Sequence, residues 1–352
     1  MHYLNPKKEL AHLVIFYRNF MAMQPNYCHV GLGINALHTA KVLRRQGIRV
    51  DIHGVRQEAD VETLLDGMFT PPTHVLIEAP WVPVKTLSRF MNKYPSSHFI
   101  VRAHSQIGFL QVEAGAIALI RDMAHLQESS LNFTNSANSE QLTSFLNRTY
   151  TANCLYLPNL YDFERVHRKR GTDHQHLKLK IGSFGALRLL KNHTSAAAAA
   201  LMIAERRRCE LEFWISVNRE ENPGAKGVLA SIRNMFSGVS WATLVENPWE
   251  QWSEFRRSVA NMDLCMQASF TETFNIVTAD AAAEGVPAVV SHAIEWAPKH
   301  WKASADDVDE IAHVGYSLLS DPESASEGLK ALQTFVDTGT KTWLKYLDTN
   351  PT

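Results

Sequence analysis

Residues 269–291, SFTETFNIVTADAAAEGVPAVVS, are the most informative part of the sequence for the fold. It predicts a loop that carries Glu272, a helix that begins directly after this loop and carries Asp280, a stop at Gly285, and then a buried strand. The apolar run at 262–266 indicates another strand before the loop, so the unit is strand, loop, helix, strand. This order places a helix N-terminus and two carboxylates at one edge of a parallel sheet.

The groups at this edge predict a ligand with both phosphates and hydroxyls. The backbone amides of residues 274–277, at the start of the helix, would bind an anion such as a diphosphate. Carboxylates accept hydrogen bonds from hydroxyl groups. A nucleotide sugar carries both kinds of group, and we therefore expect a nucleotide sugar to bind here.

Short β-rich runs alternate with helical patterns along the chain. In the first half the expected strands are residues 12–17, 48–52, 74–78, 98–102 and 130–134, with helices such as 36–46 and 114–126 between them. In the second half the expected strands are residues 177–184, 211–215, 262–266 and 287–291. This rhythm indicates two sets of parallel βαβ units, in which ligands bind outside the carboxyl ends of the strands.

The two sets are separated by residues 164–176, which are polar, basic and without hydrophobic period, and which we interpret as a linker. The predicted domains are therefore residues 1–163 and 177–325. The remaining residues, 326–352, include a tail with helical spacing of its apolar side chains.

The stretch around Glu272 resembles the donor-binding signature of glycosyltransferase family 4, whose members are retaining enzymes of the GT-B fold. That signature has two Glu residues eight positions apart, followed by Ala and a Gly-x-Pro step, and this chain has Glu272, Asp280-Ala281 and Gly285-Val286-Pro287. Asp280 departs from the pattern by one methylene, and Asn275 stands where the family usually has Gly. The resemblance implies an α/β protein of two Rossmann-like, doubly wound parallel-sheet domains that face a central cleft, with C-terminal helices that cross back to the first domain.

The resemblance also implies roles in donor binding. Glu272 would hold hydroxyls of the transferred sugar and Asp280 those of the ribose. The diphosphate would meet backbone amides in the segment Thr273, Phe274, Asn275, Ile276 and Val277. The loop 182–192 resembles the family's basic loop, in which Lys191 and Arg188 would neutralise the departing diphosphate.

Three features of the first domain also match the family's outline. Gly31 and Gly33 match its glycine loop after the first strand, although a plain tight turn would need the same residues. His104, after the expected strand 98–102, matches a catalytic His that reaches the transferred sugar, although a structural His is an equal alternative. Residues 156–162 resemble a Pro-Asn-Gly-x-Asp turn between the domains, with Leu160 in place of Gly. Glu113 could be an acid on the acceptor side or a solvent-facing residue.

The sequence predicts no metal site and no cofactor besides the donor substrate. Asp307 and Asp309 form a DxD triplet, which is the metal site of the other large glycosyltransferase fold, but they lead into an amphipathic helix. Acids at such a position complement the helix dipole. In GT-B enzymes basic side chains and helix amides generally hold the leaving diphosphate without metal.

Composition limits the class of protein. The chain has 352 residues, 45% of them hydrophobic, which suffices for two domains of ordinary size. Its formal net charge of −1 argues against a surface built as a whole for nucleic acid or an anionic membrane. The four Cys lack metal-ligand spacing, the first residues are no signal peptide, and the longest apolar run, 196–204, cannot span a bilayer, so we expect a cytoplasmic protein.

The resemblance implies a retaining glycosyltransferase that uses a nucleotide sugar, specifically a UDP-sugar. Basic clusters at 41–49, 165–170 and 206–208 could suit an anionic acceptor, although such clusters are more often solvated faces. The acceptor hydroxyl could belong to a glycan, a lipid, a small molecule or a hydroxylated DNA base. Two alternatives are a nucleotide-sugar epimerase on the same fold and a non-catalytic protein that binds nucleotide sugar or nucleic acid.

Overall fold

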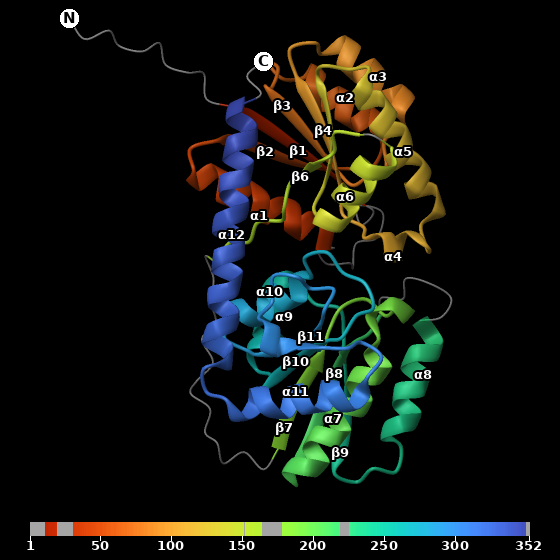
Figure 1. Ribbon diagram of the computed structural model, residues 1–352, viewed down its shortest axis with the longest axis vertical. Coiled ribbons are helices and arrows are strands. Elements are labelled where there is room, and N and C mark those ends of the chain that lie inside the picture. The colour runs from red at the N-terminus through yellow and green to blue at the C-terminus, as the bar shows by residue number, and fades with distance from the viewer. Residues whose placement is uncertain (1–10, 20–30, 151, 164–177, 219–224, 350–352) are drawn as a thin grey trace, which may run out of the picture. The chain divides into compact units, whose positions relative to one another are not determined.

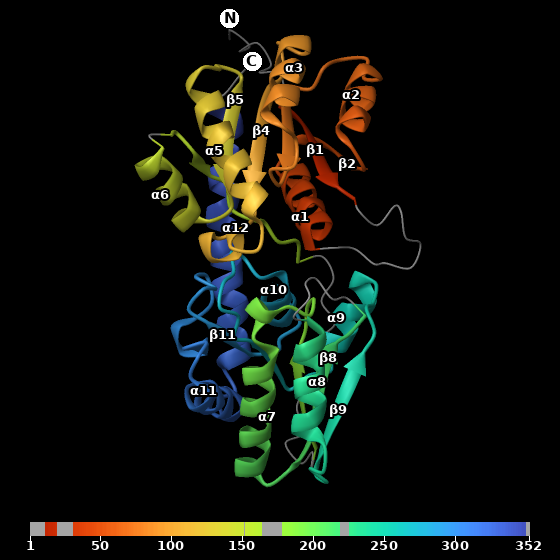
Figure 2. The ribbon, with the colours of Figure 1, turned by 90° about the vertical axis from the view of Figure 1, so that its right-hand side faces the viewer.

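The computed structural model describes residues 11–19, 31–150, 152–163, 178–218 and 225–349, which divide into two compact units (Figures 1 and 2). Unit 1 takes the described residues up to Asp162 together with those from Val336 onwards, and unit 2 takes those from Phe163 to Phe335. The predicted linker, 164–176, lies outside the described residues.

Unit 1 contains a six-stranded parallel sheet in the order β2-β1-β3-β4-β5-β6. Its strands are β1 (His12–Arg18), β2 (Arg49–Val55), β3 (His74–Glu78), β4 (His98–Ala103), β5 (Phe133–Ala137) and β6 (Leu155–Tyr156). Its helices are α1 (Gly31–Arg45), α2 (Glu58–Asp66), α3 (Val84–Lys93), α4 (Ile107–Leu110), α5 (Ala114–Glu128), α6 (Glu140–Thr149) and the last part of α12 (Ser324–Thr349). The strand order reverses between β1 and β3, where such sheets bind ligands.

Alternating apolar residues give this sheet two buried faces. Val14 and Phe16 of β1 belong to a core with α2, α3 and α5, whereas Leu13 and Ile15 belong to a core with α1 and α12. Trp343 of α12 is fully buried in the second core. The sheet is therefore covered on both sides, as its nearly continuous apolar strands require.

Unit 2 contains a second six-stranded parallel sheet in the order β12-β11-β10-β7-β8-β9. Its strands are β7 (Lys178–Ser183), β8 (Glu210–Ser216), β9 (Ala242–Asn247), β10 (Leu264–Gln267), β11 (Ala288–Ser291) and β12 (Lys302–Ala303). Its α-helices are α7 (His193–Arg207), α8 (Ala225–Phe236), α9 (Trp252–Ala260), α10 (Ile276–Ala283), α11 (Val308–Ser320) and the first part of α12. This is the strand order of the Rossmann fold, with the reversal between β7 and β10.

Several predicted boundaries differ from the structure. The strand predicted at 130–134 lies at Phe133–Ala137. The prediction missed the end of this strand because the residues there are polar, yet they are buried and hydrogen-bonded. The Ser136 hydroxyl, for example, donates to the Val101 carbonyl (3.0 Å). Strands β6, β9 and β12 were not predicted. Among the described residues, no helix is long and apolar enough to cross a membrane.

The prediction that Gly31 and Gly33 form a loop is wrong, because helix α1 begins at Gly31. A Cβ atom on Gly33 would lie 2.9 Å from the Tyr17 ring. Gly33 therefore lets α1 approach strand β1 closely, and this packing accounts for the absence of a side chain at that position.

Candidate functional site

Unit 2 brings two predicted site residues together at the reversal of its sheet. Lys191 follows strand β7, Glu272 follows strand β10, and these strands are neighbours. The Lys191 ammonium forms an ion pair with the Glu272 carboxylate, and their side chains are only 9% and 13% exposed. A cation and an acid therefore share one largely desolvated place at the carboxyl edge of the sheet.

The two loops that carry this pair are tied to each other. The Phe270 amide donates to the Leu190 carbonyl (2.9 Å), and the Asn192 side-chain amide donates to the Ala268 carbonyl (3.0 Å). Gly185 has φ +114°, which favours glycine, and a Cβ atom on Gly185 would lie 3.7 Å from Lys191 Cε. The backbone thus fixes where Lys191 and Glu272 meet.

Asn275 forms the turn before helix α10 at the position where the signature described above usually has Gly. Asn275 has φ 54°, in the left-handed region that Gly enters freely and that Asn tolerates better than most residues. Its side-chain oxygen accepts a hydrogen bond from the Thr278 amide (2.9 Å), so Asn275 also caps helix α10. Its side-chain amide donates to Gln267 Oε1 (3.0 Å), which anchors the cap to strand β10.

The backbone amides of Ile276 and Val277 lie in the first turn of α10. Amides in the first turn of an α-helix have no acceptor within the helix. The neighbouring side chains of Phe274 and Val277 are buried, and the Phe274 ring stacks on Phe335 and makes a tilted contact with Trp296. This segment can therefore meet an anion through its backbone, whereas its apolar side chains support the loop from behind.

The pKa of buried His193 is sensitive to the positive charge around this loop. Burial and the charge of Lys191 lower the pKa of His193 to about 4, the charge of Arg188 acts in the same direction, and Glu272 opposes them. The Ser183 hydroxyl is 2.8 Å from Nδ1, so the neutral ring can accept from Ser183. Half-buried Arg188 thus lies within electrostatic reach of the same place as Lys191.

Asp280 lies in the same helix but makes other contacts. Its carboxylate is fully buried, and Trp252 Nε1 lies 3.3 Å from each of its oxygens. Arg256 Nε lies 3.9 Å from Asp280 Oδ1, and the same guanidinium pairs with Glu284. The structure therefore joins Asp280 to helix α9.

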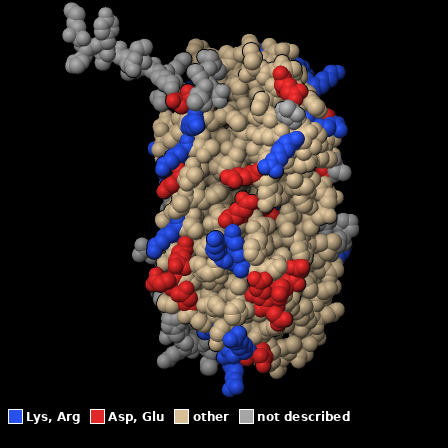
Figure 3. Space-filling model, viewed as in Figure 1, with Lys and Arg blue, Asp and Glu red and all other residues tan. Residues whose placement is uncertain are grey.

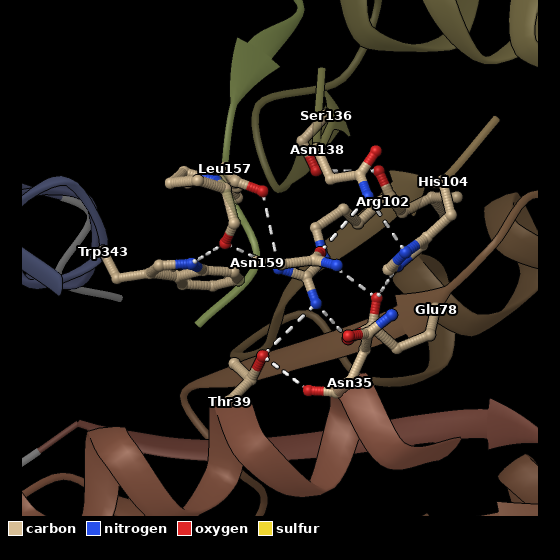
Figure 4. A network of polar contacts seen from close by, with 12 residues as sticks. Asn35, Thr39, Glu78, Arg102, His104, Ser136, Asn138, Leu157, Asn159 and Trp343 are labelled. Carbon is tan, nitrogen blue, oxygen red and sulfur yellow. Dashed lines mark hydrogen bonds and ion pairs between the residues drawn. The ribbon is translucent and has the colours of Figure 1, made fainter. Parts of the chain in front are cut away.

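In unit 1, His104 belongs to a buried polar network at the carboxyl ends of β3, β4 and β5 (Figure 4). Its Nε2 lies 2.7 Å from Glu78 Oε2, and the Asn138 side-chain amide lies 3.2 Å from its Nδ1. Burial lowers the pKa of His104, although Glu78 opposes this effect. A neutral ring that donates from Nε2 to Glu78 and accepts at Nδ1 from Asn138 satisfies both contacts.

Arg102 is the centre of this network. Its Nε donates to Glu78 Oε2 (2.9 Å), its Nη1 donates to the Pro158 carbonyl (3.1 Å), and its guanidinium lies 5.1 Å from the centre of the Trp343 ring (Figure 4). The Trp343 indole also donates to the Pro158 carbonyl (2.8 Å). Sequence reasoning missed Glu78, Arg102 and Asn138, although opposite charges at the ends of the strands predicted at 74–78 and 98–102 were a usable signal.

The other acids chosen from sequence have local partners. Glu113 accepts a hydrogen bond from the Ser105 hydroxyl (3.0 Å). Asp307 Oδ1 accepts from the Glu310 amide (2.9 Å) and caps helix α11. Within the described ranges, no cluster of His, Cys, Asp and Glu could hold a metal ion.

The basic clusters are also engaged within the chain. Lys41 and Arg45 pair with buried Asp162 at 3.4 and 2.6 Å, and Arg44 donates to the Val50 carbonyl. Arg206 lies over the ring of Tyr316 at 4.0 Å. The cluster at 165–170 lies outside the described residues. On the face in Figure 3, basic side chains lie singly or in small groups, with acidic side chains among them.

Comparison with solved structures identifies the architecture. A sucrose-phosphate synthase from Thermosynechococcus elongatus superposes with a TM-score of 0.70 and 11% identity, over 96% of this chain and 98% of that chain. The chain has the GT-B fold. The amino-acid sequence itself matches no protein-family model and no curated protein.

Two further GT-B structures extend the comparison. A UDP-forming α,α-trehalose-phosphate synthase from Burkholderia xenovorans, in complex with glucose-6-phosphate, has a TM-score of 0.68 and 9% identity, over 96% of this chain and all of that chain. TarM from S. aureus, in complex with fondaparinux, α-GlcNAc-glycerol and UDP, has a TM-score of 0.57 and 12% identity. The match to TarM covers 78% of this chain and 55% of that chain, so this chain spans about half the length of TarM.

Proposed function

We propose that this protein is a retaining glycosyltransferase of the family 4 type that transfers a sugar from a UDP-sugar to an acceptor hydroxyl. The observation that carries the proposal is the Lys191–Glu272 ion pair at the reversal of the unit 2 sheet. A nucleotide sugar has a matching partner for each group, because the ammonium suits the diphosphate and the carboxylate suits sugar hydroxyls. The choice of UDP draws on the UDP-forming synthase and on the UDP in the TarM complex.

In this proposal Lys191, Arg188 and the amides of Ile276 and Val277 stabilise the negative charge that grows on the departing diphosphate. Charge that develops in the transition state is where fixed positive groups accelerate a reaction most. Glu272 orients the sugar through its hydroxyls. The acceptor hydroxyl attacks from the face that the diphosphate leaves, so the proposal needs no enzymatic nucleophile and retains the anomeric configuration.

Donor binding in this scheme needs no metal ion, because the protein's own cations and amides meet the diphosphate. His104 in this proposal contacts a sugar hydroxyl, which takes the place of Glu78 or Asn138 as its partner. The acceptor remains a hydroxyl compound, either a glycan, a lipid, a small molecule or a hydroxylated DNA base.

The experiment measures UDP release with a panel of UDP-sugars and acceptors, together with UDP binding by calorimetry. Glu272→Gln should lower turnover by about 100-fold or more, the scale of a lost transition-state contact, and should leave UDP binding within a few fold. Lys191→Met should weaken both turnover and UDP binding. Glu246→Gln is the matched control, because Glu246 pairs with Arg233 at the surface of the same unit and should behave as wild type.

Full activity of Glu272→Gln would refute the assignment of that residue. Conversion of the UDP-sugar without any acceptor would support the epimerase alternative. Binding of UDP without turnover of any donor would support a non-catalytic binding protein. An inverted product, measured by NMR of the anomeric proton, would refute the retaining mechanism.

A further inference from the structure

A second polar cluster in unit 2 lies between helices α9 and α10. Trp252, the first residue of α9, directs its indole N–H at both oxygens of Asp280, at 3.3 Å each. Arg256, one turn further along α9, lies 5.2 Å from the centre of the Trp252 ring and pairs with Glu284, one turn after Asp280. Two residues of α9 therefore contact Asp280 of α10 and Glu284, the residue that directly follows α10, and Asp280, Arg256 and Glu284 are almost completely buried.

This geometry differs from what direct ribose binding requires. A carboxylate that holds ribose hydroxyls must present an oxygen to the ligand, and Asp280 is 0% exposed. The Asp side chain is one methylene shorter than the Glu of the family signature, so its carboxylate lies closer to the helix axis. Trp252, whose indole N–H points at that carboxylate, is half-buried and is the more accessible member of the pair.

The position of Trp252 relative to the diphosphate site also suits a nucleoside. Helix α9 begins after β9 and α10 begins after β10, so both helix starts lie at the carboxyl edge of the sheet. Asp280 lies about 7.5 Å along α10 from its capping residue Asn275, at 1.5 Å per residue. A donor whose diphosphate meets the start of α10 extends its nucleoside from that point, and a fixed indole ring offers a stacking surface.

We propose that Trp252 is the nucleoside-binding residue of this protein, and that Asp280 is a positioning residue that acts on the donor through Trp252. Asp280 accepts the indole N–H and fixes the plane of the ring. Arg256 lies over the ring and supplies a positive charge beside the buried carboxylates of Asp280 and Glu284. This inference rests on the proposed function, and it replaces a contact between Asp280 and ribose hydroxyls with a contact between Trp252 and the nucleoside.

The first test compares UDP with 2′-deoxy-UDP and 3′-deoxy-UDP on the wild-type protein by calorimetry. Without a carboxylate on the ribose, each deoxy compound should bind within about threefold of UDP. A direct hydrogen bond to a carboxylate would make at least one of them about tenfold weaker or more. Such a preference, if it disappears in Asp280→Asn, overturns the proposal and leaves the proposed function intact.

The second test removes the indole. Trp252→Ala should weaken UDP binding by about tenfold or more, as loss of stacking on a base does. Trp241→Ala is the matched control, because Trp241 is 37% exposed and precedes β9, at the opposite edge of the sheet. If Asp280 binds ribose directly, Trp252→Ala uncovers the carboxylate, and unchanged or tighter UDP binding would overturn the proposal.

The third test isolates the positioning role of Asp280. Trp252→Phe keeps an aromatic ring without the N–H, and Asp280→Leu keeps the size without the acceptor. Each should weaken UDP binding to a similar extent, the double variant should be no weaker than either, and Asp280→Asn should restore binding because its oxygen can accept from the indole. Additive losses would overturn the positioning role. Failure of the wild type to bind UDP would instead overturn the proposed function, and this inference with it.

Discussion

Replacement of Glu78 by Gln tests the buried network of unit 1 most directly. Burial by itself would raise the pKa of Glu78, but Arg102 and His104 outweigh it and lower the pKa from 4.5 to about 2. This difference of about 2.5 units corresponds to roughly 3 kcal/mol of stability at neutral pH. Since the pKa is depressed in the folded protein, the contribution is complete above pH 4.5 and is lost as the pH falls toward 2.

Glu78→Gln preserves the shape of the side chain but leaves the buried Arg102 guanidinium without its counter-charge. Loss of one partner of a buried ion pair lowers stability by about 3–5 kcal/mol. We therefore expect the variant to be less stable than the wild type by this amount at pH 7. At pH 3 the wild type has lost about 2 kcal/mol of the stability that ionised Glu78 contributes at pH 7. The difference in the free energy of unfolding between wild type and variant should therefore be about 2 kcal/mol smaller at pH 3 than at pH 7.

Urea-dependent hydrogen exchange of peptides from β3 and β4 measures the opening of unit 1 separately from unit 2. Glu62→Gln is the matched control, because Glu62 pairs with the exposed cations of Arg89 and Lys93 at 3.0 Å and should cost less than about 1 kcal/mol. The reasoning would be refuted if Glu78→Gln lost no more stability than Glu62→Gln. It would also be refuted if the stability difference between wild type and Glu78→Gln did not depend on pH.

Three further predictions concern unit 2. His193 should stay neutral at pH 6 and titrate near pH 4 by NMR, and because its pKa is lowered on folding, stability should fall as the pH drops from 6.5 toward 4; a midpoint near 6.5 would contradict its burial beside Lys191. Asn275→Ala should cost about 1–2 kcal/mol in urea unfolding, because Ala loses the cap and is strained at φ 54°, whereas Asn275→Gly should cost less; equal costs would contradict the strain argument. Turnover should persist in excess chelator, and complete loss that manganese restores would point to a metal site.

The sequence predicted the strands of both sheets where apolar residues run without interruption, as at His74–Glu78 and Ala288–Ser291. It failed where polar residues are buried, as in β5, because buried polar groups look like surface residues until their partners are known. Pairs such as Glu78 and Arg102 depend on the register of β3 against β4, which no local pattern encodes.

In the candidate site, the order of residues indicated the Lys191 and Glu272 loops but not the environment of Asp280. Spacing along α10 predicts the face on which Asp280 lies, but it does not show that Trp252 and Arg256 of α9 pack on that face. The left-handed turn at position 275 was treated as a departure from a family pattern. The structure shows that Asn there adopts the conformation for which Gly is usually needed.

Helix α12 determines the order in which the chain can complete its folding during synthesis. Unit 1 contains the first strands to leave the ribosome, yet one of its cores includes Trp343, Tyr346 and Leu347. Unit 2 has all of its residues once Phe335 has been made, and it can finish folding first. The earlier unit must therefore wait, with one apolar face of its sheet incompletely covered, until the later unit and the end of α12 have emerged.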